Sequence, residues 1–209
     1  MDNKIVMRCE YASFMDCILL SPHAFKLIGE GFTSFPESKN PKEYTRKYIN
    51  YKTEISDVIG YAPSVEYAVD CISGDPCVEE IVHIHEHELL GSDTHRDVVN
   101  VNLWKGIATY AQTSDEEIVE GKTYYTRSGT APNYTYTPVT NPSASALGTY
   151  YEKTVSTTEF EAHKRTYAVI PNNTGEGTDA LVYTGTMKAV SDPVFGKFNT
   201  ETMTFTANE

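Results

Sequence analysis

The run HIHEHE at positions 83–88 holds the densest set of metal-ligating side chains in the chain. Imidazole nitrogens and carboxylate oxygens are, with thiolates, the usual zinc ligands. His83 and His87 are four residues apart, so on a helix both lie on one face and could bind the same ion. With Glu80 as a candidate third ligand, this pattern would favour a zinc hydrolase.

The residues around this run predict a helix. Asp75 is a good N-cap, Pro76 suits the first helical position and Gly91 suits the C-terminal stop. Successive helical residues are rotated by about 100°, which places one largely apolar stripe towards a core. The members of that stripe are Val78, Ile81, Val82, His85 and Leu89.

The three histidines of the run therefore do not converge. His85 lies on the core side, whereas His83 and His87 lie on the polar side with Glu79 and Glu80. The spacing also differs from the H-E-x-x-H pattern of zinc hydrolases. We expect an amphipathic helix packed on a sheet, with a partly buried His85 and no functional metal.

The other glycine-rich or acidic motifs do not predict catalysis. The sequence has no G-x-S-x-G elbow and no Walker loop. GEGF (29–32) is followed by Ser34 where a nucleotide-binding loop has its third glycine. NNTGEGTDA (172–180) lacks the alternating ligands of a calcium loop and predicts a hairpin turn. We expect no catalytic residue, no cofactor and no metal, and thus a protein that is not an enzyme.

Composition narrows the class of protein further. The 209 residues include 17 basic and 29 acidic ones, a net charge of −12, which argues against a protein that grips nucleic acid through its phosphates. No apolar stretch approaches the ~20 residues of a membrane span, and no signal peptide is expected. The four cysteines form no C-x-x-C pair and are expected to be free, buried thiols: Cys9, Cys17, Cys71 and Cys77.

Most of the chain predicts β-strands, because segments rich in Val, Ile, Thr, Tyr and Phe alternate with Gly, Pro, Asn and Asp. The expected strands are 24–33, 44–58, 61–72, 96–104, 160–170, 179–190 and 194–206. Segment 44–58 is polar on both faces, which is typical of a strand that lies at an edge or protrudes and invites partners.

Residues 111–152 differ in style from the rest. They are dense in Thr, Ser, Tyr, Asn and Pro and contain few large aliphatic residues. Pairs such as Tyr124-Tyr125 and Tyr150-Tyr151 favour some ordered β-structure over a disordered loop. We expect a small β-rich surface insertion at 111–152 in a core made of 1–110 and 153–209.

Several long segments of the sequence resemble those of one protein family. NPKEYTRKYI, DVIGYAPS with a following helix that begins DPCVEEI, TYAVIPNNTGEGTDALVYTGTMKA (166–189) and ETMTFTANE (201–209) occur in this order. This resembles the tail tube proteins (major tail proteins) of tailed phages that infect Gram-positive bacteria. The resemblance covers about 25–104 and 160–209, and the Tyr/Thr-rich insertion also resembles segments of other tail proteins.

The resemblance implies a mainly β fold: a β-sandwich of two antiparallel sheets flanked by one α-helix. It also implies a structural virion protein of the siphovirus type that forms stacked, hexameric rings. Stacked rings make a hollow tail tube, the conduit for ejection of the viral genome. The chain would be made in the cytoplasm of the bacterial host and reside in the virion, away from any membrane.

Partners follow from the same resemblance. They are other copies of the chain, the tape measure protein, the tail terminator and viral DNA that passes through the lumen without specific binding. Long hairpins in this family bind neighbouring subunits, and the segment around 44–57 is the candidate arm. Its interface candidates are Lys42, Tyr44, Arg46, Tyr48, Asn50, Tyr51 and Lys52.

Three alternatives remain open at this stage. The inner tube of a contractile, phage-tail-like particle would share the fold. A virion-displayed carbohydrate-binding β-sandwich would use the tyrosines of 111–152. The zinc hydrolase would use His83 and His87.

Overall fold

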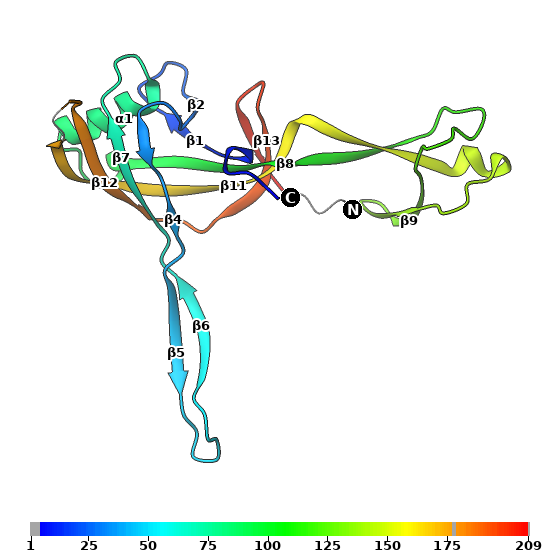
Figure 1. Ribbon diagram of the computed structural model, residues 1–209, viewed down its shortest axis with the longest axis horizontal. Coiled ribbons are helices and arrows are strands. Elements are labelled where there is room, and N and C mark those ends of the chain that lie inside the picture. Colours follow the sequence, from blue (N-terminus) through cyan, green and yellow to red (C-terminus); the bar gives the residue numbers. More distant parts are fainter. Residues whose placement is uncertain (1–4, 177–178, 209) are drawn as a thin grey trace.

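The structure is a computed structural model that describes residues 5–176 and 179–208 (Figure 1). Its described residues form a large twelve-stranded sheet, a separate two-stranded sheet and one α-helix. The prediction of a mainly β fold with one α-helix is confirmed. The large sheet curls and branches, so that its parts form the layers around the core. The described residues also form three short 3-10 helices: Arg8–Glu10, Gly91–Thr94 and Ala144–Thr149.

The large sheet is organised by one long strand, β11 (Tyr150–Glu176), which runs through the whole horizontal axis of Figure 1. One edge of β11 pairs with β8 (His95–Gln112). The other edge pairs in turn with β9 (Tyr124–Thr130), β13 (Val194–Asn199) and β12 (Val182–Ala189). The sequence predicted only 160–170 and 96–104 for β11 and β8. Both strands are longer because they continue beyond the core as a twisted ribbon.

A bulge marks the point where the ribbon leaves the core. Val155 pairs with Ala108 but Phe160 pairs with Gly106, so the four residues 156–159 of β11 lie opposite Ile107 alone. The Ser156 hydroxyl accepts hydrogen bonds from the backbone N–H groups of Thr158 and Glu159 and holds this turn. A Cβ on Gly106 would lie 2.2 Å from the Ser156 carbonyl oxygen, so the close approach requires glycine.

Helix α1 (Pro76–Glu86) covers the larger hydrophobic cluster. The Asp75 carboxylate accepts a hydrogen bond from the backbone N–H of Val78 (2.9 Å), as expected of an N-cap. The helix ends at Glu86 with His87 as its C-cap, and Gly91 instead begins a 3-10 helix. The cluster joins α1 to β1 (Tyr11–Cys17), β7 (Ser64–Asp70), β8, β11 and β12, and its buried members include Met15, Val69, Ile81, Ile84, Tyr167 and Met187.

The helix buries three residues outside the predicted stripe: Cys77, Glu80 and Ile84. Val78 and Ile81 are buried, and Val82 and Leu89 pack partly buried against the cluster, but Ile84 is also fully buried. Glu80, predicted on the polar side, is fully buried. The reason is Arg96 on β8, whose Nε donates to the Glu80 carboxylate at 2.7 Å while its Nη1 donates to two backbone carbonyls. A paired, hydrogen-bonded carboxylate can occupy a position that the helical pattern assigns to solvent.

A second cluster lies on the opposite face of the sheet. It contains Phe14, Val99, Val101, Ala162 and Phe198, covered by Phe25, Phe205 and other partly buried neighbours. Strands β13 and β14 (Thr204–Ala207) fold over this face, and β2 (Ala24–Leu27) extends its edge.

Several predicted strands are divided in the structure. Segment 24–33 contains β2 and the start of β3 (Phe32–Ser34), with Gly31 at φ +79° in the turn between them. Segment 194–206 contains β13, a turn and β14, and β7 and β12 lie within 61–72 and 179–190. In the predicted hairpin turn at 172–180, positions 177–178 lie outside the described residues.

The cysteines differ from the prediction in burial. The four thiols are free, but only Cys17 and Cys77 are buried, with their sulfur atoms 3.7 Å apart. Cys9 and Cys71 are exposed because they lie in connecting segments outside both hydrophobic clusters.

Candidate self-assembly surfaces

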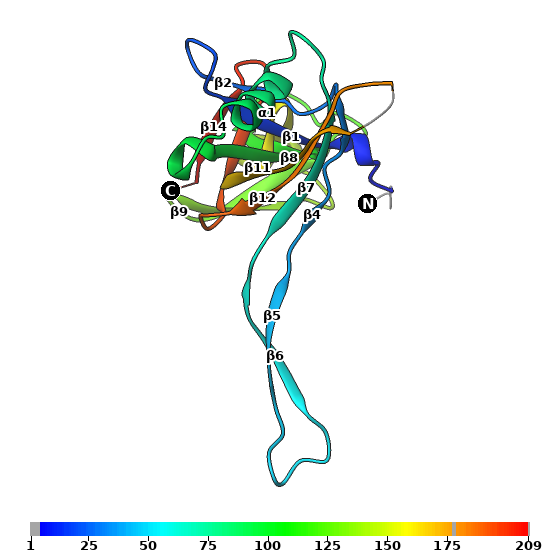
Figure 2. The same cartoon turned by 90° about the vertical axis from the view of Figure 1, so that its left-hand side faces the viewer.

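Two projections leave the core in different directions (Figures 1 and 2). The first, which we call the arm, consists of residues 41–61 and points away from the curled sheet. The second, which we call the lobe, consists of residues 110–153 and lies at the far end of the β8–β11 ribbon. Both views show the arm clear of the rest of the chain.

The arm corrects the single strand predicted at 44–58. Strand β5 (Pro41–Arg46) and strand β6 (Ile55–Tyr61) form an antiparallel hairpin, with the chain reversing between them. They form their own two-stranded sheet, so each has an unpaired outer edge. The sequence predicts one continuous strand over 44–58 because the turn at 47–54 contains no Gly or Pro. Strand β4 (Glu37–Ser38) connects the arm to the large sheet through β7.

The arm has no buried side chain. Every residue of β5 and β6 is exposed except Gly60, which is intermediate. Its surface is nevertheless apolar and aromatic, with Ile49 fully exposed and Ile59 66% exposed. Such surface on a two-stranded hairpin is typical of a segment that is completed by a partner.

The seven predicted interface residues all lie on this arm and are exposed. Lys42, Tyr44 and Arg46 belong to β5, and the others belong to the turn: Tyr48, Asn50, Tyr51 and Lys52. The Arg46 guanidinium carbon lies 5.3 Å from the ring centre of Tyr44 and 5.9 Å from that of Tyr48, and the ring centres of Tyr48 and Tyr51 are 6.1 Å apart. Sequence reasoning missed the apolar members of the surface, Ile49, Ile55, Val58, Ile59 and Tyr61. One signal was the pair Val58 and Ile59, two adjacent aliphatic residues in a strand with no apolar face.

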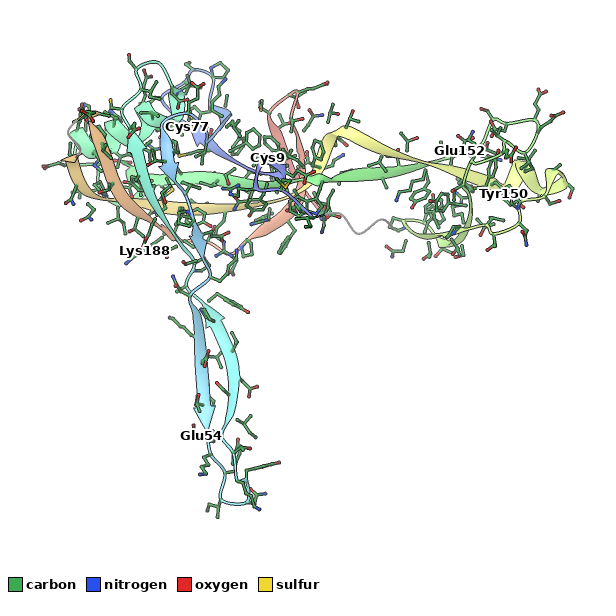
Figure 3. The ribbon with its side chains drawn as sticks, viewed as in Figure 1. Cys9, Glu54, Cys77, Tyr150, Glu152 and Lys188 are labelled. Carbon is green, nitrogen blue, oxygen red and sulfur yellow. The ribbon has the colours of Figure 1, made fainter. Side chains whose placement is uncertain are left out.

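The lobe has a small core of its own on one face of its sheet. Tyr124, Leu147 and Tyr150 are buried, and Ile118, Val139 and Ala146 pack against them. The loop between β8 and β9 covers this face: the Tyr124 hydroxyl donates to Asp115 at 2.6 Å. Figure 3 shows Tyr150 and Glu152 at this end of the ribbon, far from Glu54 near the end of the arm.

An ionic network fixes the loop to the strands. The Lys122 ammonium bridges Asp115 (2.7 Å) and Glu152 (2.9 Å). Hydrogen bonds from Lys122 and Tyr124 hold the pKa of Asp115 below its ordinary value of 3.8. Hydrogen bonds from Thr113 and Lys122 likewise lower the pKa of Glu152 from 4.5. Both carboxylates are therefore charged at neutral pH and stabilise the loop through Lys122.

The other face of the lobe sheet, which we call the open face, lies opposite the small core. It carries every second residue of β8, β9, β10 (Asn133–Pro138) and β11. Its members are Tyr110, Tyr125, Arg127, Tyr134, Tyr136, Tyr151 and Lys153. The rings of Tyr110 and Tyr136 stack with centres 3.9 Å apart, and the Arg127 guanidinium lies 4.4 Å from the ring centre of Tyr134 and 4.8 Å from that of Tyr151. All seven residues are at least partly exposed.

The histidines of the candidate zinc site do not gather ligands. The rings of His83 and His87 are 4.1 Å apart, but Glu80 is paired with Arg96. Across residues 5–176 and 179–208, no group of three or more His, Cys, Asp or Glu side chains is arranged to hold a metal ion. His85 contacts the Tyr67 hydroxyl at 2.8 Å and the Thr174 hydroxyl at 3.2 Å, and burial lowers its pKa. This contact gives His85 a structural role in the core.

A hollow lies beside β1 and β3. Its volume is about 1090 Å³, and its walls include Phe14, Leu27, Phe32, Phe35, Leu103 and Phe160. The walls lack a convergent set of charged groups of the kind that marks a catalytic pocket. Within the described part of the chain, no helix is both long and apolar enough to cross a membrane.

Comparisons with known proteins identify no family for this chain. No protein-family model and no curated protein matches the chain. A solved structure of the anti-feeding prophage (AFP) baseplate, 6-fold symmetrised, contains a chain that is similar with 9% sequence identity and a TM-score of 0.42. The alignment covers 96% of this chain and 99% of that one. A TM-score below 0.5 does not establish a shared fold.

Proposed function

We propose that this chain is a structural protein of a phage or phage-derived particle, and that it assembles with copies of itself. In its specific form, the proposal is a tail tube made of stacked rings, with viral DNA passing through the lumen. The tape measure protein and the tail terminator would then be the other partners. Such a role requires no catalytic residue and no cofactor.

One observation carries the self-assembly proposal: the arm exposes an apolar and aromatic surface without burying any of it. A hairpin of this kind is marginally stable alone, and its two unpaired edges are ready to accept another strand. Tyr and Arg side chains are enriched in protein interfaces, and the arm holds Arg46 between two tyrosines. The partner would therefore bury this surface.

Two further features support the tube form. The segments 25–104 and 160–209 resemble those of tail tube proteins. The net charge of −12 suits a wall along which DNA must slide, because like charges repel. Contacts between different surfaces of identical chains generate rings, or filaments when the rotation does not close.

The test is negative-stain electron microscopy of the purified full chain, with mass photometry over a range of protein and salt concentrations. Rings or tubes with a central channel are the expected result. A tip variant with Tyr48→Ser, Ile49→Ser and Tyr51→Ser should remain monomeric at concentrations at which the wild type assembles.

A matched control replaces three exposed apolar side chains outside the arm: Leu90→Ser, Leu181→Ser and Val190→Ser. This control should assemble like the wild type. A wild-type chain that stays monomeric under all conditions, or a tip variant that assembles normally, would contradict the proposal. Closed particles without a channel would retain self-assembly but exclude the tube.

A further inference from the structure

The two faces of the lobe differ in charge and lie on opposite sides of one sheet. Tyr124 and Tyr150 point into the small core, and their chain neighbours Tyr125 and Tyr151 belong to the open face. Residues alternate between the two faces of a strand, so the loop that covers Tyr124 is on the side away from Arg127. The loop segment 114–120, which we call the acidic loop, therefore cannot reach the open face of its own lobe.

We infer that the open face binds the acidic loop of a second copy of this chain. The inference deepens the proposed function and rests on it, because it names a second contact between the assembling copies. It assigns a role to residues 110–153, which the arm contact does not use.

Charge complementarity identifies the partner. Glu116, Glu117 and Glu120 are exposed, and no described residue forms an ion pair with them. On the open face, Arg127 and Lys153 are exposed and have no carboxylate partner within residues 5–176 and 179–208. These two cations form a positive surface in a protein of net charge −12, so an acidic segment of the same chain is a complementary occupant.

The open face is also organised for protein contact. The Arg127 guanidinium is held between the rings of Tyr134 and Tyr151, so little of its freedom remains to be lost on binding. Rigid tyrosine rings and arginine are the residues that most often dominate interface energy. On the acidic loop, Val119 is 47% exposed and gives those rings an apolar contact between the glutamates.

The placement of the two surfaces determines the geometry of the contact. Each lobe would offer its acidic loop to one neighbour and its open face to the other. A contact between two different surfaces is head-to-tail, and it closes into a ring or continues as a filament. The ribbon carries the lobe away from both the core and the arm, so the contact can form beside the one made by the arm (Figure 1).

The test uses two full-length charge-reversal variants. The loop variant carries Glu116→Lys, Glu117→Lys and Glu120→Lys, and the face variant carries Arg127→Glu and Lys153→Glu. Each variant alone has a loop and a face of like charge, and we expect its assembly to be weakened at least about tenfold. An equimolar mixture should assemble with wild-type concentration dependence, because every loop then meets a face of opposite charge.

General electrostatic attraction cannot explain that rescue. Starting from −12, the loop and face variants have net charges of −6 and −16, so both chains remain negative. A control variant with Glu30→Lys, Glu66→Lys and Glu201→Lys has the same net charge as the loop variant but no change in the lobe. It should assemble like the wild type, and its mixture with the face variant should show no rescue. Thermal unfolding followed by circular dichroism verifies that each variant is folded.

The outcomes separate this inference from the proposed function. If the wild type assembles and the tip variant does not, but the mixture is no better than either reversal alone, the lobe contact is wrong and the proposed function stands. If loop and face pair but no rings form and the tip variant has no effect, the contact stands and the proposed function is wrong. A wild type that never self-associates overturns both. Binding of a glycan array by the open face, with assembly unaffected by either reversal, reassigns this face to carbohydrate and overturns the inference.

Discussion

The arm and the lobe are both hairpin-based projections from one core, but they treat their apolar residues in opposite ways. The arm leaves Ile49, Ile59 and its tyrosines in solvent and has no buried side chain. The lobe buries Tyr124, Leu147 and Tyr150 and closes that core with an ionic network. A projection therefore needs an internal core to be stable alone, and one without a core depends on a partner.

The largest expected effect comes from the core on which both projections rest. Arg96→Met leaves the Glu80 carboxylate buried without its partner, which should cost about 3–5 kcal/mol of unfolding free energy. Both projections should then lose order together, as measured by urea unfolding and amide hydrogen exchange. The double variant Glu80→Gln with Arg96→Met should recover much of the loss, because no buried charge remains. If Arg96→Met alone lowers the unfolding free energy only slightly, Glu80 must be hydrated or protonated once Arg96 is absent.

A substitution inside the lobe should destabilise the lobe without affecting the arm. Tyr124→Ala removes the centre of the small core and should cost about 3–5 kcal/mol of local stability. Amide exchange should accelerate in 113–152 while the central part of the sheet and the arm keep their wild-type rates. Tyr134→Ala on the open face is the matched control and should leave lobe exchange nearly unchanged. Faster exchange throughout the protein would mean that the lobe is not an independent unit.

Acid should weaken the lobe through Asp115 and Glu152. Their pKa values are lower in the folded state than the ordinary 3.8 and 4.5, so their stabilising contribution is present above those values. It is lost as pH falls below about 4 through the lowered folded pKa values. Lys122→Met should be less stable than the wild type at pH 7, and the difference in amide exchange of the lobe should narrow as the pH falls below about 4. A difference that stays constant from pH 7 to pH 3 would indicate that Lys122 acts by packing.

The smallest expected effect belongs to the arm. Ile59→Ser in the monomer should change the unfolding free energy by no more than about 0.5 kcal/mol, because Ile59 is 66% exposed and packs against no described cluster. Chemical denaturation at low protein concentration measures this value. A loss above 1 kcal/mol would show that the arm packs within its own subunit, which would remove the contrast with the lobe.

The helix and the general β character could be predicted from sequence because their signals are local. Asp75 and Pro76 determine where α1 begins, and residues of strand propensity recur along the chain. The burial of Glu80 could not be predicted, because its cause is Arg96, sixteen residues away in sequence on another element. Helical periodicity considers only one element at a time.

The candidate site was predicted in part. The polar segment around Tyr44 and Arg46 suggested a protrusion, but its hairpin depends on pairing such as Tyr44 with Asp57 across a turn without Gly or Pro. The open face depends on the register of four strands, which brings Tyr110 beside Tyr136 from a hairpin far along the chain. The tyrosine pairs predicted some order in 111–152, but only the register shows which tyrosines are buried and which form a surface.

Strand β11 should make the molecule resistant to tension along its long axis. It is continuous from the lobe to the far end of the core and pairs on both edges for much of its length. Hydrogen bonds of an antiparallel ladder lie perpendicular to the strands, so a pull along β11 loads many of them in shear at once. Tension applied at the lobe is therefore carried into the core by one unbroken strand, and the bulge at 156–159 is the place where that strand can bend.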